Sequence, residues 1–211
     1  MIHIGIIPDG NRRWAKHNKI EQYNIENVMT NIIKKIISNV DYHTFKNLNS
    51  ICEVTFYLLT RDNLDRKDNT VQTISAILNR FSQLITDDMT KLFNVHFIGN
   101  LELLPKDLYD ICETIKNKFD KNGRIKMNVA IAYDPITDIK QIVENSPSRP
   151  IQSNIDLVIR TGGELRSSGF FPLQTLYSEW IYLPKFFPDF TIQDLDNCIS
   201  EYLKRSRRFG K

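Results

Sequence analysis

The stretch of sequence that decides the fold is the amino-terminal run Ile2-His3-Ile4-Gly5-Ile6-Ile7-Pro8-Asp9-Gly10-Asn11-Arg12-Arg13-Trp14. Its first part, Ile2 to Pro8, is a compact apolar run that predicts a buried β-strand. A polar loop with two arginines follows at once. The same order, a short apolar run and then a longer helical pattern, recurs along the chain, which predicts βαβ units and a mostly parallel sheet.

Strand and helix patterns alternate from one end of the chain to the other. The predicted strands are Ile2–Pro8, Ile51–Leu59, Asn94–Ile98, Ile125–Ala132 and Ile155–Ile159. The predicted helices are Asn24–Val40, Asp68–Phe93, Lys106–Phe119, Thr137–Glu144 and Thr191–Lys204. The span Asp68–Phe93 has the clearest apolar stripe of a half-buried helix, whereas Leu173–Tyr182 fits either a helix or a strand. We expect an α/β fold: a single domain over 1–211, with a mostly parallel twisted sheet surrounded by helices.

Composition and charge narrow the classes of function. The 211 residues are 41% hydrophobic and 25% charged, as in ordinary globular proteins. The sequence has neither an apolar run of the ~18 residues that a spanning helix needs nor the features of a signal peptide at its start, so we expect a cytoplasmic protein. A net charge of +3 is too small to indicate nucleic-acid binding. The basic clusters at Arg12-Arg13 and at 204–208 suit diphosphate groups as well as polynucleotides.

Cysteines and histidines show no metal-binding spacing. Cys52, Cys112 and Cys198 are far apart, and we expect reduced thiols that mostly lie in the core. The four histidines form no pair at ligand spacing. A zinc site is therefore not expected.

The loop Pro8–Trp14 follows the first predicted strand, and ligands of such sheets lie beyond the carboxyl ends of the strands. Gly10 allows close approach of the backbone to a ligand, while the following amides, Arg12 and Arg13 face an anion. Asp9 would be repelled by a bare phosphate, so its presence suggests a bridging Mg²⁺. The alternative is a simple Asp-Gly turn capped by surface arginines.

Two further loops follow predicted strands. The loop 60–66 supplies a hydroxyl, an amide and two basic groups that could position a substrate and relay a proton, although Asx residues before a helix are more often caps. The loop 159–169 combines paired glycines, arginines and serines, as in an anion pocket. Its alternative is a flexible Gly-Gly turn. Glu179 lies in an aromatic, apolar segment, where an acid seldom only contacts solvent, although a helix cap is also possible.

These motifs resemble those of a known family. The run 8–15 resembles the Asp-Gly-Asn-x-Arg-Trp-Ala signature of cis-prenyltransferases, the undecaprenyl and dehydrodolichyl diphosphate synthases, and 156–164 resembles their second signature. The segments 177–179, 187–190 and 207–210 continue the match in the right order. The resemblance implies a parallel sheet with a hydrophobic tunnel, and a Mg²⁺-dependent enzyme. It would condense isopentenyl diphosphate with an allylic prenyl diphosphate into a Z-configured product and release pyrophosphate.

The resemblance also assigns roles to single residues. Asp9 would hold Mg²⁺, with Glu179 as a second ligand. Asn63 corresponds to the proposed proton acceptor, with the Thr60 hydroxyl beside it. The residues expected to hold the allylic diphosphate are Gly10, Asn11, Arg12, Arg13 and Arg66, and Trp14 and Asp62 are also expected to bind substrate. The diphosphate of isopentenyl diphosphate would be bound by Arg160, Arg166 and Ser168. The family usually forms homodimers whose tail, here Arg208-Phe209-Gly210, reaches the partner's site with its arginine and glycine.

Several departures from the family pattern fall mainly on the allylic site. The expected Arg-x-x-Gly-His stretch is replaced by 21–25, an aromatic residue by Leu64, and a histidine by Leu165. The sequence therefore leaves open the allylic donor, the length of the product chain, and whether coupling is regular or irregular (lavandulyl-type). A second hypothesis is a non-catalytic subunit of a heteromeric synthase, but such subunits generally lose the residues retained as Asp9, Arg160 and Arg166. A nucleic-acid-binding module is suggested by the basic tail alone and lacks a stacking pattern. Membrane contact is expected only through a lipid product.

Overall fold

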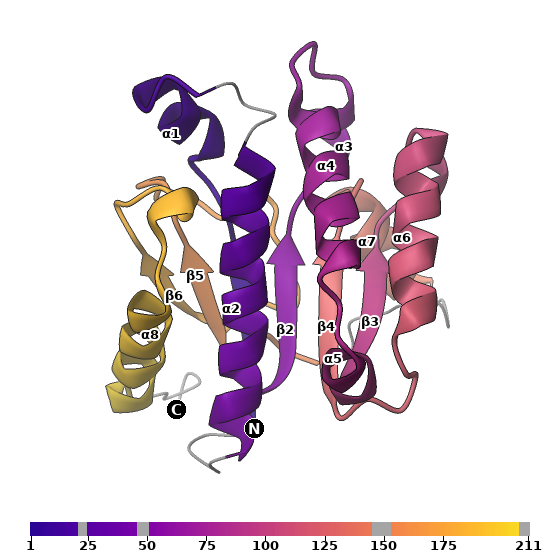
Figure 1. The fold of residues 1–211 in the computed structure, drawn as a ribbon. Helices are drawn as coiled ribbons and strands as arrows, with labels where there is room; N and C mark the ends of the chain where they lie inside the picture. Colours follow the sequence, from indigo (N-terminus) through magenta and orange to yellow (C-terminus); the bar gives the residue numbers. More distant parts are fainter. Residues whose placement is uncertain (21–24, 46–50, 145–152, 207–211) are drawn as a thin grey trace.

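The computed structural model describes residues 1–20, 25–45, 51–144 and 153–206. It contains a six-stranded sheet in the order β3-β4-β2-β1-β5-β6, and every strand pair is parallel. The strands are β1 (Ile2–Ile7), β2 (Ile51–Tyr57), β3 (Phe93–Ile98), β4 (Ile125–Ala130), β5 (Leu157–Arg160) and β6 (Glu179–Tyr182). The predicted α/β fold with a parallel sheet and surrounding helices is confirmed (Figure 1).

The helices cover the two faces of the sheet unequally. They are α1 (Asn11–His17), α2 (Glu26–Phe45), α3 (Arg61–Leu64), α4 (Thr70–Gln83), α5 (Asp87–Leu92), α6 (Lys106–Lys118), α7 (Pro135–Val143) and α8 (Ile192–Lys204), with short 3₁₀ turns η2 (Leu101–Leu103) and η3 (Phe187–Asp189). Helices α2, α4, α6 and α8 lie on the front face in Figure 1, over the larger apolar core. On the opposite face a smaller aromatic core contains Tyr57, Tyr133, Phe170 and Phe171.

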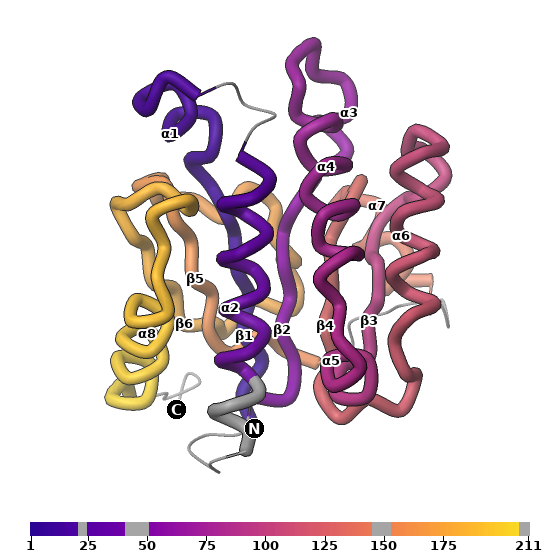
Figure 2. Tube along the Cα trace, viewed as in Figure 1, coloured from indigo at the N-terminus to yellow at the C-terminus, as the bar shows by residue number. Residues whose placement is uncertain are grey.

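Strand β1 lies inside the sheet, between β2 and β5 (Figure 2). The chain leaves β1 toward β2 on one side and returns from β4 to β5 on the other, so the strand order reverses at β1. In open parallel sheets, the carboxyl ends of strands at such a switch point form the usual ligand crevice. The three loops singled out in the sequence leave the carboxyl ends of β1, β2 and β5.

The prediction of one helix over Asp68–Phe93 was wrong. The structure contains α4, which ends at Gln83, and a separate α5 that begins at Asp87. Thr86 is extended and its hydroxyl accepts a hydrogen bond from the Met89 amide at 3.4 Å, which caps α5. Apolar side chains continue through the break, because Ile85 and Met89 still pack against the core. The apolar pattern in the sequence therefore continues across the break between α4 and α5, which is why one long helix was predicted.

Other differences concern short elements. The segment Leu173–Tyr182, left as a helix or a strand, contains the edge strand β6. Two short helices, α1 and α3, lie within loops whose helical turns were not predicted. Cys112 and Cys198 are buried free thiols, as expected, and Cys52 is half-buried. Among the helices of the described residues, the structure has none long and apolar enough to cross a membrane.

Candidate active site

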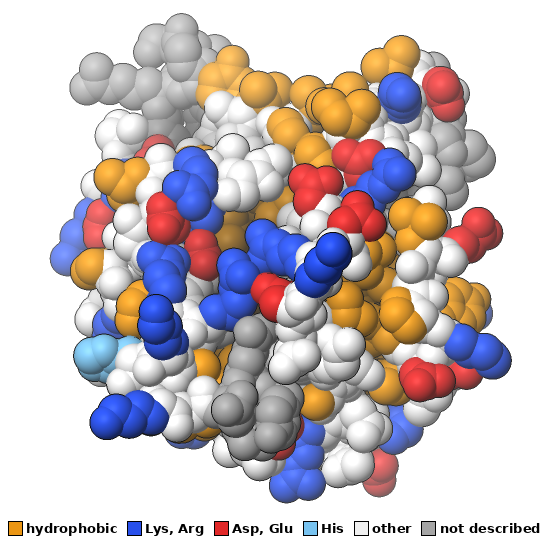
Figure 3. Space-filling view, turned by 90° about the horizontal axis from the view of Figure 1, so that it is seen from above, with side chains coloured by type: hydrophobic (Ala, Val, Ile, Leu, Met, Phe, Trp, Pro, Cys, Tyr) orange, Lys and Arg blue, Asp and Glu red, His pale blue; other side chains and the backbone are white. Residues whose placement is uncertain are grey.

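A cavity of about 780 Å³ opens at the carboxyl ends of β1, β2 and β5. Seen from above, Lys and Arg side chains gather around a central hollow, with acidic side chains among them (Figure 3). Basic residues that line the cavity are Arg12, Arg13, Lys16, Arg66, Arg160 and Arg166. Its acidic residues are Asp9, Asp62 and Glu164. A cavity whose cations outnumber its carboxylates suits a strongly anionic ligand.

The loop after β1 is held in place by the loop after β5. The Asp9 amide donates to the Thr161 hydroxyl oxygen at 3.0 Å, and that hydroxyl donates to the Asp9 carbonyl at 2.9 Å. Gly162 has a φ of +92°, and a Cβ there would lie 2.9 Å from the Arg13 guanidinium. Glycine adopts this positive φ without the strain that a Cβ would bring. The two loops are therefore held together by direct contacts.

Arg160 is the buried cation of the site. Its side chain is 4% exposed, and its Nη2 lies 2.8 Å from Asp9 Oδ2. Its Nη1 donates to Ser168 Oγ at 2.8 Å and to the Arg166 carbonyl. Within the described residues its Nε has no hydrogen-bond partner. Both terminal nitrogens of the guanidinium are thus held in place, while the Nε–H donor has no partner among the described residues.

Asp9 is held in the charged form. Partial burial alone would raise its pKa, but hydrogen bonds from Arg160 and from the Gly10 amide, with the charges of Arg160 and Arg13, outweigh burial and keep the pKa below its usual value. The Gly10 amide donates to Asp9 Oδ1 at 2.6 Å. The Asp9 side chain remains 32% exposed. Asp9 therefore presents an ionised carboxylate to the cavity.

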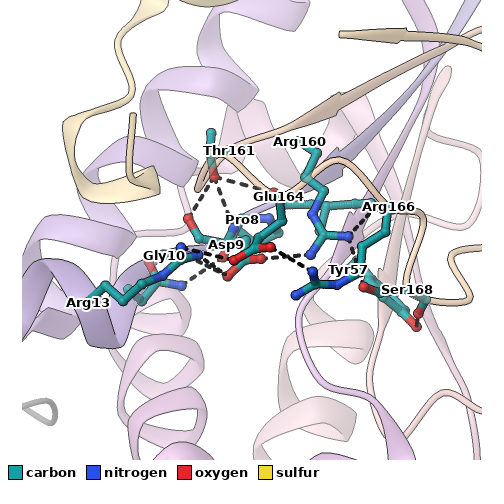
Figure 4. A network of polar contacts seen from close by, with 12 residues as sticks. Pro8, Asp9, Gly10, Arg13, Tyr57, Arg160, Thr161, Glu164, Arg166 and Ser168 are labelled. Carbon is teal, nitrogen blue, oxygen red and sulfur yellow. Dashed lines mark hydrogen bonds and ion pairs between the residues drawn. The ribbon is translucent and has the colours of Figure 1, made fainter. Parts of the chain in front are cut away.

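Glu164 connects the first and the third loops (Figure 4). Its Oε1 accepts from Arg13 Nη1 at 3.1 Å, and its Oε2 accepts from Arg166 Nη1 at 2.6 Å. Arg13 also lies 3.4 Å from Asp9 Oδ1. Four charged side chains therefore form a continuous chain across the cavity.

The loop after β2 forms the third wall. Thr60, Asp62, Asn63 and Arg66 all line the cavity. Asn63 Oδ1 accepts from the Thr60 amide at 3.1 Å, a capping-box contact in which Thr60, and not an Asx residue before the helix, is the N-cap. Asn63 therefore both caps α3 and lines the cavity. Beside it, the Tyr57 hydroxyl donates to the Ser168 carbonyl at 3.1 Å and supports the loop after β5.

The inner part of the cavity is apolar. Its lining includes Ile25 from just before α2, Leu58 and Leu59 after β2, and Ile74 and Ile77 on α4. Leu58 and Ile77 also line a small apolar void of about 20 Å³ deeper in the core. The site thus joins a charged mouth to an apolar interior.

Two predicted site residues lie away from the cavity. The Trp14 indole N–H donates to Asp189 at 2.8 Å, and the cavity lining does not include Trp14. Glu179 pairs with Leu157 at the amino end of β5, whereas Ile7, two residues before Asp9, pairs with Arg160 at its carboxyl end. Asp9 and Glu179 therefore do not share a metal site within one chain. Arg208 and Gly210 lie outside the described residues.

Sequence reasoning assigned no role to Glu164, Lys16 or Tyr57. Lys16 lines the cavity because it is four residues after Arg12 on α1, and such residues share a helix face. Recognising α1 would have identified it. Glu164 lies at the end of the motif 156–164. Its two guanidinium partners, Arg13 and Arg166, come from two loops that only the fold brings together.

Oxygen ligands at Asp9 fit a hard divalent cation. Mg²⁺ commonly takes one or two protein carboxylates and completes its shell with water and substrate phosphates. The ionised, cavity-facing Asp9 supplies such a carboxylate. Among the residues that the structure describes, no group of three or more His, Cys, Asp or Glu forms a complete metal cage. The donor set therefore fits a cation shared with a bound diphosphate.

The parallel sheet and the paired anion loops define a family, and the sequence comparison agrees. Residues 7–210 match the family model described as "Putative undecaprenyl diphosphate synthase", so the chain belongs to the prenyltransferase family of that description. It is 32% identical to a tritrans,polycis-undecaprenyl-diphosphate synthase (geranylgeranyl-diphosphate specific) of Pyrococcus horikoshii, over 99% of this chain and 86% of that protein. It is 29% identical to an isoprenyl transferase of Rickettsia typhi, over 99% of this chain and 97% of that protein.

Solved structures also match the fold. Lavandulyl diphosphate synthase from Lavandula x intermedia, in complex with dimethylallyl diphosphate, superposes with a TM-score of 0.81 at 27% identity, covering 99% of this chain and 98% of that chain. A probable undecaprenyl diphosphate synthase from Campylobacter jejuni gives a TM-score of 0.76 at 21% identity, with 99% and 98% covered. The second match concerns the fold alone.

Proposed function

We propose that this protein is a cis-prenyl diphosphate synthase that condenses isopentenyl diphosphate with an allylic prenyl diphosphate. The observation that carries the proposal is the cavity in which two basic loops meet an apolar interior. A substrate with a diphosphate head and a hydrocarbon chain requires both parts. The family and its relatives, named for prenyl diphosphate synthesis, support the same reaction.

The allylic diphosphate is assigned to the loop after β1. Arg12 and Arg13 would hold its oxygens, with Gly10 allowing close approach of the backbone and with Asn11 and Arg66 nearby on the cavity wall. Mg²⁺ held by Asp9 would neutralise this diphosphate and stabilise the departing pyrophosphate. Two diphosphates bring more negative charge than the surplus of cations in the cavity, which also favours a bound divalent cation.

Isopentenyl diphosphate is assigned to the loop after β5. Arg160, Arg166 and Ser168 would bind its diphosphate, so that the double bond faces the allylic carbon. Fixed cations lower the barrier by stabilising charge as it develops, and no covalent nucleophile is needed. Apolar walls at Leu58, Leu59 and Ile77 would keep water from the reacting carbon. Asn63 and Thr60 lie where the released proton could be accepted.

Assembly into a homodimer is part of this proposal. Arg205, just before the tail, pairs with Glu179 at 2.9 Å at the amino end of β6, the end of the sheet opposite the cavity. As the family resemblance implies, Arg208 and Gly210, with Glu179 as a second metal ligand, would serve the site of a second chain. Membrane contact would arise only through a lipid product.

The direct test incubates the pure protein with Mg²⁺, labelled isopentenyl diphosphate and either dimethylallyl or geranylgeranyl diphosphate. Extraction and product analysis should show pyrophosphate release and a Z-configured chain. Absence of product with every donor, with Mg²⁺ in excess, would contradict the proposal and leave the non-catalytic subunit. A control with the Asp9→Ala variant excludes contaminating synthases.

Irregular coupling is a second candidate, favoured by the similarity to lavandulyl diphosphate synthase. The same incubation separates the two candidates. Dimethylallyl diphosphate supplied without isopentenyl diphosphate would yield a branched product only in the irregular reaction. Regular condensation requires both substrates.

A further inference from the structure

Glu164 holds one arginine from each of the two diphosphate loops. Oε1 accepts from Arg13, which lies on α1 after the first loop, and Oε2 accepts from Arg166 in the loop after β5 (Figure 4). Among the described residues, the acidic partners of these two arginines are Glu164 and, for Arg13, also Asp9 at 3.4 Å. One carboxylate thus bridges the two halves of the site.

The carboxylate of Glu164 occupies guanidinium positions that a diphosphate would use. Carboxylate and phosphate oxygens bind the same N–H fork of arginine. The Glu164 side chain is 30% exposed and lines the cavity, while those of Arg13 and Arg166 are 46% and 64% exposed. All three side chains therefore have room to exchange partners. Arg160, by contrast, is buried and fixed by Asp9 and Ser168.

We propose that Glu164 is an internal competitor of the diphosphates. It releases Arg13 and Arg166 when substrates bind, takes Arg13 back when pyrophosphate leaves the allylic side, and takes Arg166 back when the diphosphate of the product leaves. The proposal rests on the proposed function, since the two diphosphates are those of the substrates assigned above. A ligand must displace the carboxylate, and the displaced charge then repels it. Both effects weaken binding and speed release, which a repeating condensation cycle requires.

A purely orienting role predicts the opposite sign. If Glu164 only held the two guanidiniums ready for a ligand, its loss would release them and diphosphates would bind more weakly. An internal competitor, when removed, leaves tighter binding. Equilibrium binding of one diphosphate without turnover therefore separates the two roles.

The first experiment measures binding of inorganic pyrophosphate to full-length Glu164→Gln by calorimetry, with and without Mg²⁺, at fixed ionic strength. We expect binding about two- to fivefold tighter than in the wild type, the range for an exposed ion pair. Glu113→Gln is the matched control: it removes the same charge from a pair with Lys116 at 3.2 Å on α6, outside the cavity lining. Unchanged or weaker pyrophosphate binding to Glu164→Gln would overturn the proposal.

The second experiment follows turnover. Glu164→Gln should lower KM for both substrates and lower kcat, while the single-turnover rate stays as in the wild type, because release alone is slowed. Asp68→Asn is a comparison variant that affects one of the two diphosphate loops. Asp68 contacts Arg12 at 2.8 Å, and among the described residues it contacts no arginine of the loop after β5. The variant should change KM for the allylic donor alone. If Glu164→Gln instead raised KM and slowed the single turnover, the proposed role of Glu164 in diphosphate release would be contradicted. Failure of the wild type to condense would count against the proposed function and would leave the pyrophosphate test intact.

Discussion

Two carboxylate–arginine pairs at opposite ends of the sheet differ in what surrounds them. At the carboxyl end, Asp9 and Arg160 lie 2.8 Å apart beside a large cavity. At the amino end, Glu179 and Arg205 lie 2.9 Å apart, and neither lines that cavity. The pairs have the same chemistry and nearly the same distance. In the first pair the arginine is buried and the cavity leaves room for a ligand, so this pair belongs to the candidate site. The second pair joins α8 to the edge strand.

The largest expected effect is that of Asp9→Ala, which breaks the first pair. Condensation should fall to background because the variant loses both the metal ligand and the partner of Arg160. The fold should persist, since the loop is still held by the backbone contacts to Thr161. Product formation in saturating Mg²⁺, with thermal melting as the control, measures both. Near-normal turnover would remove Asp9 from the metal site.

The next effect concerns Arg160 and its exposed neighbour Arg166. Replacing either with Ala should raise KM for isopentenyl diphosphate by about ten- to a hundredfold, the cost of one charge-assisted contact. The allylic donor's KM should change much less. Arg160→Ala should cost more, because its guanidinium is fixed before substrate binds. Steady-state kinetics with each substrate varied in turn tests this, and equal effects on both substrates would contradict the division of the site.

A smaller effect is expected at the second pair. Glu179→Gln and Arg205→Gln should each lower activity by about two- to fivefold, since a partly exposed pair contributes little. Similar losses of activity in both variants would indicate that the Glu179–Arg205 pair acts as a structural anchor. A loss confined to Glu179→Gln and reversed by added Mg²⁺ would instead support the metal-ligand role. Titration of Mg²⁺ in both variants separates these outcomes.

The smallest effect is a pH dependence of stability. The pKa of Asp9 in the folded protein is below its ordinary value of 3.8, so its contribution is present above that pH and is lost as pH falls through the folded pKa. The difference in melting temperature between wild type and Asp9→Asn should therefore shrink from neutral pH toward pH values below about 3.8. A difference that stays constant over this range would show that the pair with Arg160 does not set the pKa.

Much of the fold and of the site could be predicted from local sequence. Apolar runs identified five of the strands, and loops after three of them contained most of the cavity lining. Glu179, which the sequence could not place relative to Asp9, shows the limit. A motif gives the order of residues along the chain, but the register of β5 with β6 decides at which end of the sheet a residue lies. The Thr86 cap was visible in the sequence, but the uninterrupted apolar period hid the break between α4 and α5.

The position of β1 inside the sheet has a consequence for synthesis of the chain. This strand precedes the other five strands of the sheet in the sequence, yet one of its edges is paired only when β5 emerges, and Asp9 meets Arg160 across a separation of 151 residues. Until then the nascent protein exposes an open strand edge, and Asp9 lacks its partner Arg160. Contacts of such long range also slow folding. The candidate pocket is therefore incomplete until β5 is made, and a ribosome stalled before β5 carries a sheet fragment that is open to wrong pairing with other chains.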